Sequence, residues 1–433
     1  MYLNCHSYYS LRYGTFPVEK LAEMAAENGI GTLVLTDINN SMGVVDFVKA
    51  CNKNGVNPVA GIEFRDGNEL LYIGIARNNE GFKELNEFLS HHNLNKLPLP
   101  RTAPVFSHSY VIYPFGVKTP PQLHANEYTG IRSTELNRLL SSEYLKQQHK
   151  LVALCPVTFD GELGYELHRN LRAIDNNTLL SMLVPSQVAA PDERFTRQEE
   201  LESLFGYYPQ IIANTGKLLD DCSIAFEFGT VKNKKLFTRS AYDDRLLLEK
   251  LALDGLVYRY GKSNKEARQR VKHELGIIDK LGFSSYFLIT WDIIRYTMSR
   301  GFYHVGRGSG ANSIVAYCLR ITDVDPIELN LYFERFLNPK RSSPPDFDID
   351  FSWKDRDEVF DYIFKRYGHK HTALLGATST FKGKSILREL GKVYGLPKEE
   401  IDLLVEEPNN PLNNNDITSH ILKLGTRMTD FPN

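Results

Sequence analysis

Carboxylates and apolar side chains alternate in residues 345–351, which read Pro-Asp-Phe-Asp-Ile-Asp-Phe. Successive side chains of a β-strand point to opposite faces, so Asp346, Asp348 and Asp350 should share one face of a strand. Carboxylates that crowd together repel each other, and a cation between them relieves that repulsion. Mg²⁺ favours such oxygen ligands, and two ions about 4 Å apart serve in-line phosphoryl transfer. The pattern therefore predicts either a metal-binding strand or a solvated edge strand with an apolar inner face.

A glycine-rich segment lies about 40 residues upstream of the acidic strand. Three glycines fall within residues 306–310, where they allow backbone angles and close approaches that side chains forbid. The apolar stretch 314–319 is predicted to be helical, and its first N–H groups could face an anion. No Gly-Lys-Ser/Thr follows, so this is not a Walker loop. Together with the acidic strand, the segment predicts a triphosphate cradle, with further donors from Arg307, Ser309 and Ser313.

Four short blocks in this region resemble the palm of the bacterial replicative DNA polymerase III α subunits, which are C-family DNA polymerases. The blocks follow one another within about 45 residues and comprise residues 306–310, 321–326, 333–339 and 345–348. The resemblance continues into the N-terminal region and covers essentially the whole chain. It implies a palm of the polymerase-β nucleotidyltransferase type, with Asp346 and Asp348 as catalytic, Mg²⁺-binding aspartates.

The same resemblance implies roles for residues around these aspartates. The nucleotide-binding loop would comprise Gly306, Arg307, Gly308 and Ser309. The resemblance does not make Asp350 a metal ligand, although it lies on the same predicted face. Lys384 and Arg388 are four residues apart and should share one helix face, where the family's thumb begins. There they would meet phosphates of DNA or of the incoming nucleotide, or else form an ordinary solvated face.

The implied activity is that of a DNA-directed DNA polymerase, which adds dNTPs to a primer 3′ end with two Mg²⁺ ions in the palm. In this family a third aspartate comes from a later palm segment, which would lie beyond residue 433. We therefore expect residues 1–433 alone to be inactive in primer extension but still able to bind nucleotide weakly. The implied partners are primer–template DNA, a dNTP, a sliding clamp and other replisome subunits.

Strand and helix patterns alternate over the first 80 residues. Apolar spacing is helical in residues 17–28 and 43–53, and strand-like runs cover residues 32–35, 58–63 and 71–75. This order predicts an α/β fold with a parallel sheet closed as a barrel. Three polar residues fall at the carboxyl ends of these predicted strands, where α/β folds place their chemistry: His6, Asp37 and Glu63.

This arrangement resembles the polymerase-and-histidinol-phosphatase (PHP) domain that opens these α subunits. In active members the resemblance implies a trinuclear metal site with a His-x-His pair near the start and an Asp-His pair after the second strand. Here the pairs read Asn-Cys-His at residues 4–6 and Asp-Ile at 37–38, so two imidazoles are replaced. Only His6, Asp37 and Glu63 match, and zinc-type sites need three or four well-placed ligands. We expect a degenerate PHP domain whose metal site is lost.

Two alternatives remain open for this N-terminal domain. It could be a metal-dependent phosphoesterase or 3′–5′ exonuclease, in which case hydrolysis would depend on His6 and bound metal. It could instead be a docking platform for a separate proofreading exonuclease, as the resemblance implies. Metal analysis and binding to such a subunit would distinguish the two alternatives.

The length of 433 residues favours about three domains. We expect a PHP domain in residues 1–228, an incomplete palm in 229–377 and the helical start of a thumb in 378–433. Residues 229–310 carry 16 Lys and Arg against 8 Asp and Glu, which indicates a phosphate-facing surface or solvated helix faces. The chain has no apolar run of about 18 residues, no signal-peptide pattern and no Cys-x-x-Cys. These features favour a cytoplasmic protein, and the family resemblance implies a bacterial one.

Overall fold

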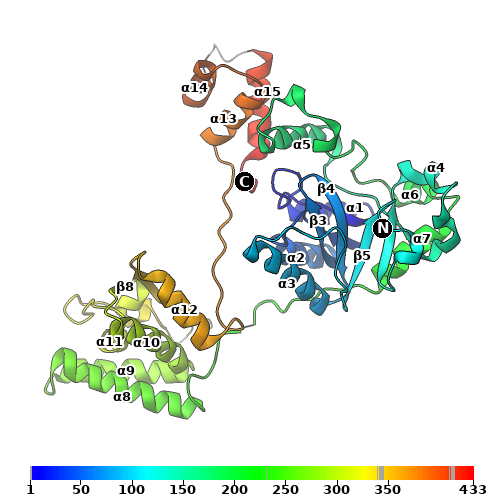
Figure 1. Ribbon diagram of the computed structural model, residues 1–433. Coiled ribbons are helices and arrows are strands. Elements are labelled where there is room, and N and C mark those ends of the chain that lie inside the picture. The colour runs from blue at the N-terminus through cyan, green and yellow to red at the C-terminus, as the bar shows by residue number, and fades with distance from the viewer. Residues whose placement is uncertain (1, 231, 339, 341–345, 409, 411–414) are drawn as a thin grey trace. The chain divides into compact units, whose positions relative to one another are not determined.

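The computed structural model describes residues 2–230, 232–338, 340, 346–408, 410 and 415–433 (Figure 1). The chain divides into two compact units, one of residues 1–227 with 377–433 and the other of residues 228–376. The division into three domains, with a thumb beginning at residue 378, stays a prediction. Among the described residues, no helix has both the length and the apolar composition that crossing a membrane requires.

Seven strands form a curled sheet in the first unit, in the same order as along the chain. Strands β1 to β3 are parallel, as are β5 to β7, whereas β4 is antiparallel to both of its neighbours. The sheet's two edges meet through Val157, which follows β7: its N–H donates to the Asn4 carbonyl at 2.9 Å, and its carbonyl accepts from the His6 N–H at 2.8 Å. The strands are β1 (Tyr2–Cys5), β2 (Thr32–Leu35), β3 (Asn57–Asp66), β4 (Glu69–Ala76), β5 (Ser109–Pro114), β6 (Glu127–Ile131) and β7 (Leu151–Ala153).

Strand β4 corrects the predicted all-parallel order. We expected residues 71–75 to continue a parallel sheet, but β4 runs antiparallel to β3, with Gly61 opposite Ile75. Only Gly67 and Asn68 connect the two strands, whereas a parallel neighbour needs a crossover of about a dozen residues. Gly67 has a φ of +56°, a left-handed conformation that glycine adopts at low cost and that permits this tight turn.

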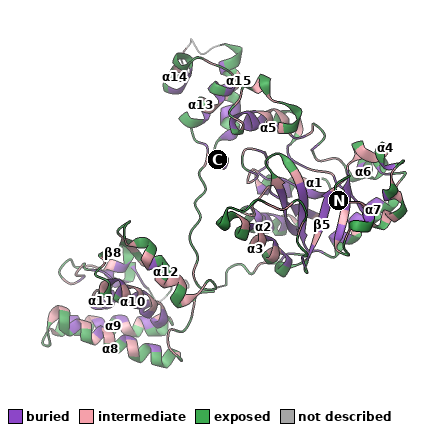
Figure 2. Cartoon of the chain, viewed as in Figure 1, coloured by how far each residue is buried: buried purple, intermediate pink, exposed green. Residues whose placement is uncertain are grey.

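Helices cover the outside of this sheet and bury one face each (Figure 2). Helices α1 (Val18–Glu27), α2 (Val44–Asn54) and α3 (Asn79–Asn95) pack apolar side chains into the main core. The later helices α13 (Lys384–Val393) and α15 (Asp416–Met428) share a buried cluster with α5 (Gly161–Asp175), in which Leu171, Leu390 and Leu424 take part. The remaining helices of the unit are α4 (Leu136–Leu139), α6 (Gln198–Leu204), α7 (Pro209–Asp220) and α14 (Lys398–Glu406).

A buried histidine joins three segments of this unit. His168 on α5 is fully buried; its Nδ1 lies 2.7 Å from the Tyr13 carbonyl, and its Nε2 accepts from the Ala189 N–H at 2.8 Å. These partners require a neutral imidazole that is protonated on Nδ1. Burial lowers the pKa of His168 to about 3, although the Tyr13 carbonyl acts in the opposite direction.

We expect His168 to make the first unit less stable in mild acid. Above pH 6.5, its usual pKa, the imidazole is neutral in both the folded and the unfolded state. Below that pH only the unfolded state takes up the proton, so the free energy of unfolding should fall by about 1.4 kcal/mol per pH unit until the folded-state pKa is reached. Urea unfolding followed by far-UV circular dichroism between pH 7 and 5 measures this slope. His168→Gln should lack this part of the pH dependence, and identical slopes in both proteins would contradict the assignment.

The second unit packs helices around one core and carries a two-stranded ribbon. Leu248, Val271, Phe287 and Ile314 are among the buried residues of this core. Strands β8 (His304–Arg307) and β9 (Asp348–Phe351) pair antiparallel, with Arg307 opposite Asp348 and Val305 opposite Asp350. The helices are α8 (Ala241–Tyr260), α9 (Lys265–Lys280), α10 (Ser284–Ser299), α11 (Ile314–Cys318) and α12 (Arg356–Tyr367).

A buried carboxylate fastens α12 to α10. Asp292 on α10 is 1% exposed and accepts hydrogen bonds at its Oδ2 from Tyr362 at 2.8 Å and Tyr367 at 2.9 Å. Arg366 and Arg295 approach the same carboxylate at 3.2 and 2.9 Å. Burial alone would raise the pKa of Asp292, but the hydrogen bonds from the tyrosines and Arg366 lower it. The residue therefore has a structural role that does not involve the ribbon.

Candidate functional site

The acidic strand has the alternation that its sequence predicts. Asp346, Asp348 and Asp350 are exposed, whereas Phe347, Ile349 and Phe351 are half-buried and pack on the core of the second unit. Strand β9 begins only at Asp348, so Asp348 and Asp350 share the outer face of the ribbon, whereas Asp346 lies just before the strand and is exposed as well. Pro345, at the start of the motif, lies outside the described residues.

The glycine-rich loop lies directly against this strand. It forms a 3-10 turn over Gly308–Asn312. Gly308 has a φ of +73°, and a Cβ built there would lie 2.6 Å from Asp348 Oδ2. A Cβ at Gly310 would lie 2.8 Å from the Phe347 ring, and one at Gly306 would clash with the Ile321 carbonyl. The glycines are thus required by close packing, and the loop and the acidic strand form one surface.

The three acids of the strand differ in their partners. Asp350 Oδ2 lies 2.8 Å from Arg307 Nε, and both side chains are more than half exposed. Among the described residues, neither Asp346 nor Asp348 makes an ion pair or a side-chain hydrogen bond. Exposed carboxylates are oxygen ligands of the kind that Mg²⁺ takes. The carboxylates of Asp346 and Asp348 therefore fit a metal, while the guanidinium of Arg307 already neutralises Asp350.

The start of the helix after the loop corrects a prediction. We expected the first N–H groups of this helix to face an anionic ligand, but a buried carboxylate already binds them. Glu274 on α9 accepts from the Ile314 N–H at 3.1 Å, the Val315 N–H at 3.2 Å and the Ser313 hydroxyl at 2.8 Å. The Ser313 hydroxyl in turn accepts from the Ala316 N–H at 3.1 Å. The start of α11 is therefore not available to a phosphate.

The two predicted basic residues lie in the other compact unit. Lys384 and Arg388 are both exposed on α13, whereas Ile386 and Leu390 of the same helix are buried. The two basic side chains share the solvent face, as their spacing indicates. Their proposed contact with phosphates stays a prediction.

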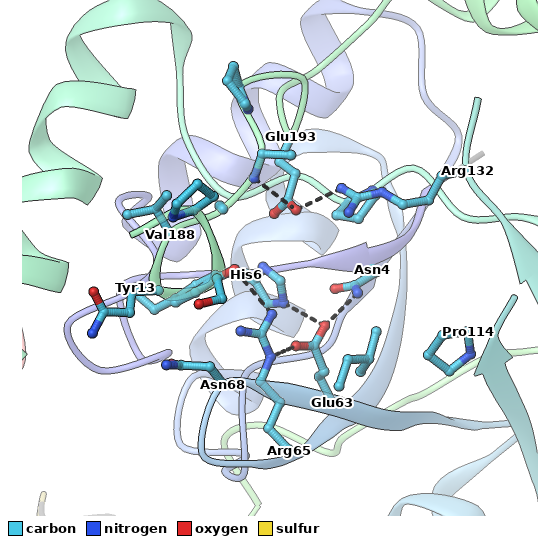
Figure 3. Close-up of a pocket in the computed structure, with 18 of the residues that line it drawn as sticks. Asn4, His6, Tyr13, Glu63, Arg65, Asn68, Pro114, Arg132, Val188 and Glu193 are labelled. Carbon is cyan, nitrogen blue, oxygen red and sulfur yellow. Dashed lines mark hydrogen bonds and ion pairs between the residues drawn. The ribbon is translucent and has the colours of Figure 1, made fainter. Parts of the chain in front are cut away.

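Asn4, His6 and Glu63 line a pocket of about 770 Å³ in the first unit (Figure 3). Glu63 is fully buried, and its Oε2 lies 3.0 Å from His6 Nε2 and accepts from Asn4 Nδ2 at 2.5 Å. Its other oxygen pairs with the guanidinium of Arg65, whose side chain is 11% exposed. Burial alone would raise the pKa of Glu63, but Arg65 and His6 hold it below its usual range. The carboxylate is thus already neutralised by protein groups.

The interactions of His6 continue to the far wall of the pocket. His6 Nδ1 lies 2.9 Å from the Thr158 hydroxyl, which donates to Glu193 at 2.7 Å. Glu193 pairs with Arg132 Nη2 at 2.7 Å (Figure 3). The two carboxylates that His6 and Thr158 connect, Glu63 and Glu193, are therefore each paired with an arginine.

Asp37 takes no part in this path. It is 1% exposed and accepts from the Ser7 N–H and hydroxyl, both at 2.7 Å, and from the Ser10 hydroxyl at 2.6 Å. Burial raises the pKa of Asp37, although these hydrogen bonds act in the opposite direction. The three residues that match the PHP ligand pattern do not converge on one point, because hydroxyl groups bind Asp37 separately.

The residues present do not fit the metal centre that the PHP resemblance implies. The described residues contain no group of three or more His, Cys, Asp or Glu side chains placed to hold a metal. The Arg65 guanidinium also occupies the Glu63 carboxylate that would be needed. Sequence reasoning missed Arg65, yet a signal was present: it follows Glu63 by two residues on β3, and residues i and i+2 of a strand share a face.

Comparison with known proteins identifies both parts of the chain. Residues 3–220 match the family model of the PHP domain, and residues 246–424 match that of the bacterial DNA polymerase III alpha NTPase domain. The chain is 31% identical to DNA polymerase III subunit alpha of Bacillus subtilis, over 94% of this chain and 39% of that protein. It is 29% identical to the error-prone DNA polymerase of Symbiobacterium thermophilum, over 94% of this chain and 42% of that protein. The chain thus spans about two fifths of the length of these curated relatives.

Proposed function

This chain belongs to the family of bacterial DNA polymerase III α subunits, and from that premise we propose that residues 228–376 form the nucleotide-binding part of a DNA-directed DNA polymerase. The reaction would be addition of a dNTP to the 3′ end of a primer. One observation carries the proposal: Gly308 lies against the carboxylate of Asp348 with no room for a side chain. A triphosphate on the loop would therefore lie beside the acids that hold its metal.

Each residue of this surface would have a distinct role. Asp346 and Asp348 would bind Mg²⁺ through their exposed carboxylate oxygens, and two ions there would supply the positive charge that eases phosphoryl transfer. Ser309, which is exposed, would donate its hydroxyl to the phosphates, and the loop backbone at Gly308 would approach them closely. Arg307 would add charge once it turns from Asp350 to the nucleotide. Gly306 would let the backbone at the start of the loop pack closely on Ile321.

We infer a structural role for the PHP domain. The paired carboxylates Glu63 and Glu193 support this role, because each already has an arginine beside it. The same pairs disfavour the alternative of a metal-dependent phosphoesterase or exonuclease. Docking of a proofreading exonuclease stays open, as do contacts of the polymerase with primer–template DNA, a sliding clamp and other replisome subunits. A DNA substrate of this kind would place the protein in the bacterial cytoplasm.

We expect residues 1–433 to bind dATP in the presence of Mg²⁺ but not to extend a primer. Binding should occur because the loop and two carboxylates are in place, and extension should fail because a third carboxylate, which the family resemblance implies, is not among these acids. Calorimetric titration of dATP with Mg²⁺ or with EDTA measures the first part. A primer-extension assay beside an active polymerase measures the second. Equal dATP binding with and without Mg²⁺, or robust extension, would contradict this account.

A further inference from the structure

Helix α9 contacts the exit of the glycine-rich loop through a fully buried carboxylate. Glu274 has no exposed surface, and three donors of the loop exit converge on it: the Ser313 hydroxyl and the N–H groups of Ile314 and Val315. A helix as short as α11, which spans five residues, could be capped by its own Ser313 alone. The added carboxylate must therefore be explained by something other than capping.

Arg270 contacts the same segment from one helical turn earlier. Its Nε lies 3.5 Å from Glu274, so the two form an i,i+4 pair on α9. Its guanidinium donates to three backbone carbonyls, those of Asn312 at 3.3 Å, Pro326 at 3.3 Å and Leu331. Glu274 thus accepts hydrogen bonds from residues 313–315, and Arg270 donates one to the carbonyl of Asn312, the residue just before them.

The contacts extend to the residue proposed to bind phosphate. The Asn312 side chain is largely buried, and its Nδ2 donates to the Ser309 carbonyl at 2.8 Å. The backbone carbonyl of the same Asn312 is bound by Arg270. Residues 312–315 are therefore bonded directly to α9, and Ser309 is joined to α9 through Asn312.

Burying the charges of Glu274 and Arg270 costs free energy, so some benefit must offset this cost. Burial raises the pKa of Glu274 to about 7 even though the loop donors and Arg270 favour its charged form. Apolar side chains of similar size are often at least as stabilising as a buried ion pair, and buried polar groups can instead specify one conformation. Here the specified conformation is that of the loop beside Asp348.

We propose that Arg270 and Glu274 are positioning residues, which hold the Ser309–Val315 segment in the shape that a nucleotide triphosphate requires. The inference rests on the proposed function of this loop. Neither residue would touch the nucleotide; both would act through the backbone that does.

The test compares variants of these residues with a matched control in residues 1–433. Glu274→Gln and Arg270→Met remove one charge each. Asp292→Asn removes another buried, multiply bonded carboxylate from the same unit, whose partners lie on α10 and α12 rather than in the loop. At a temperature where all variants are folded, we expect the two α9 variants to bind dATP with Mg²⁺ about tenfold more weakly, as expected when one hydrogen bond to the nucleotide is lost. Hydrogen exchange within residues 308–316 should also accelerate. Asp292→Asn should lower the unfolding temperature without either change.

Two results would overturn the positioning role of Arg270 and Glu274 but leave the proposed function intact. One is normal dATP binding and normal exchange in both α9 variants, while Ser309→Ala binds weakly. The other is an equal loss of binding in Asp292→Asn, which would indicate general destabilisation. If the unmodified chain does not bind dATP, or if Ser309→Ala binds as tightly as it does, the proposed function fails and the inference fails with it.

Discussion

Replacing Arg65 by methionine is expected to lower the free energy of unfolding of the first unit by about 3–5 kcal/mol, the usual cost of leaving a buried charge without its partner. Glu63 is fully buried and Arg65 is only 11% exposed, so solvent can screen the remaining carboxylate very little. Both tryptophans of the chain, Trp291 and Trp353, lie in residues 228–376. Far-UV circular dichroism during urea unfolding follows both units, and tryptophan fluorescence reports the second alone, so a transition seen only by circular dichroism belongs to the first unit.

The double variant Glu63→Gln/Arg65→Met is the matched control for this prediction. It removes both charges, and the introduced glutamine keeps an oxygen that can accept from Asn4, so most of the lost stability should return. EDTA should leave the unfolding of the unmodified protein unchanged, because Arg65 rather than a metal neutralises Glu63. A loss below about 1 kcal/mol in Arg65→Met, a value usual for exposed ion pairs, would contradict the buried pair. Stabilisation of the first unit by Zn²⁺, with unfolding of the second unit unchanged by tryptophan fluorescence, would contradict the assigned loss of the metal site.

The substitution Gly308→Ala is expected to abolish measurable dATP binding while the second unit stays folded. A Cβ at Gly308 would lie 2.6 Å from Asp348 Oδ2, so the carboxylate would have to move away from the loop. The left-handed backbone at φ +73° adds about 1–2 kcal/mol of strain for a residue with a side chain. Calorimetric titration of dATP with Mg²⁺ measures the loss of binding.

Gly301→Ala separates the contact with Asp348 from the backbone strain. Gly301 has nearly the same φ, +75°, in the same unit, but a Cβ there would have no neighbour within 4 Å. Both variants should show similar losses of stability by tryptophan fluorescence, and only Gly308→Ala should lose nucleotide binding. Equal dATP binding by the two variants would show that Gly308 is required for the turn rather than for the site.

The parts of the fold that could be predicted from the sequence are those set by local pattern. The alternation in residues 346–351 depends only on the two-residue period of a strand, and the exposed acids and half-buried apolar residues confirm it. The glycines of the loop were likewise predicted to allow close approach, and Gly308 and Gly310 do pack against Asp348 and Phe347. Family resemblance added the order of the two domains, which the family models confirm.

The parts that could not be predicted depend on contacts between distant segments. Glu274 lies in a helix with many exposed charges, and nothing in that helix indicates that one carboxylate is buried against a loop 40 residues away. The same holds for Arg132 and Glu193, which meet across the pocket from separate loops. The antiparallel β4 is different, because Gly67 between two strand patterns was a hairpin signal that the expected alternation of strands and helices outweighed.

We propose that the glycine-rich loop and the pair Asp346 and Asp348 form one metal–nucleotide site. It can be tested by adding Mn²⁺ with dATP to residues 1–433 in which the glycines carry a nitrogen-15 label. Mn²⁺ strongly broadens NMR signals of nearby nuclei. If the site is shared, the amide signals of Gly306, Gly308 and Gly310 should be lost selectively, and they should be retained in Asp348→Asn. Unchanged loop signals, or broadening that persists in Asp348→Asn, would contradict it.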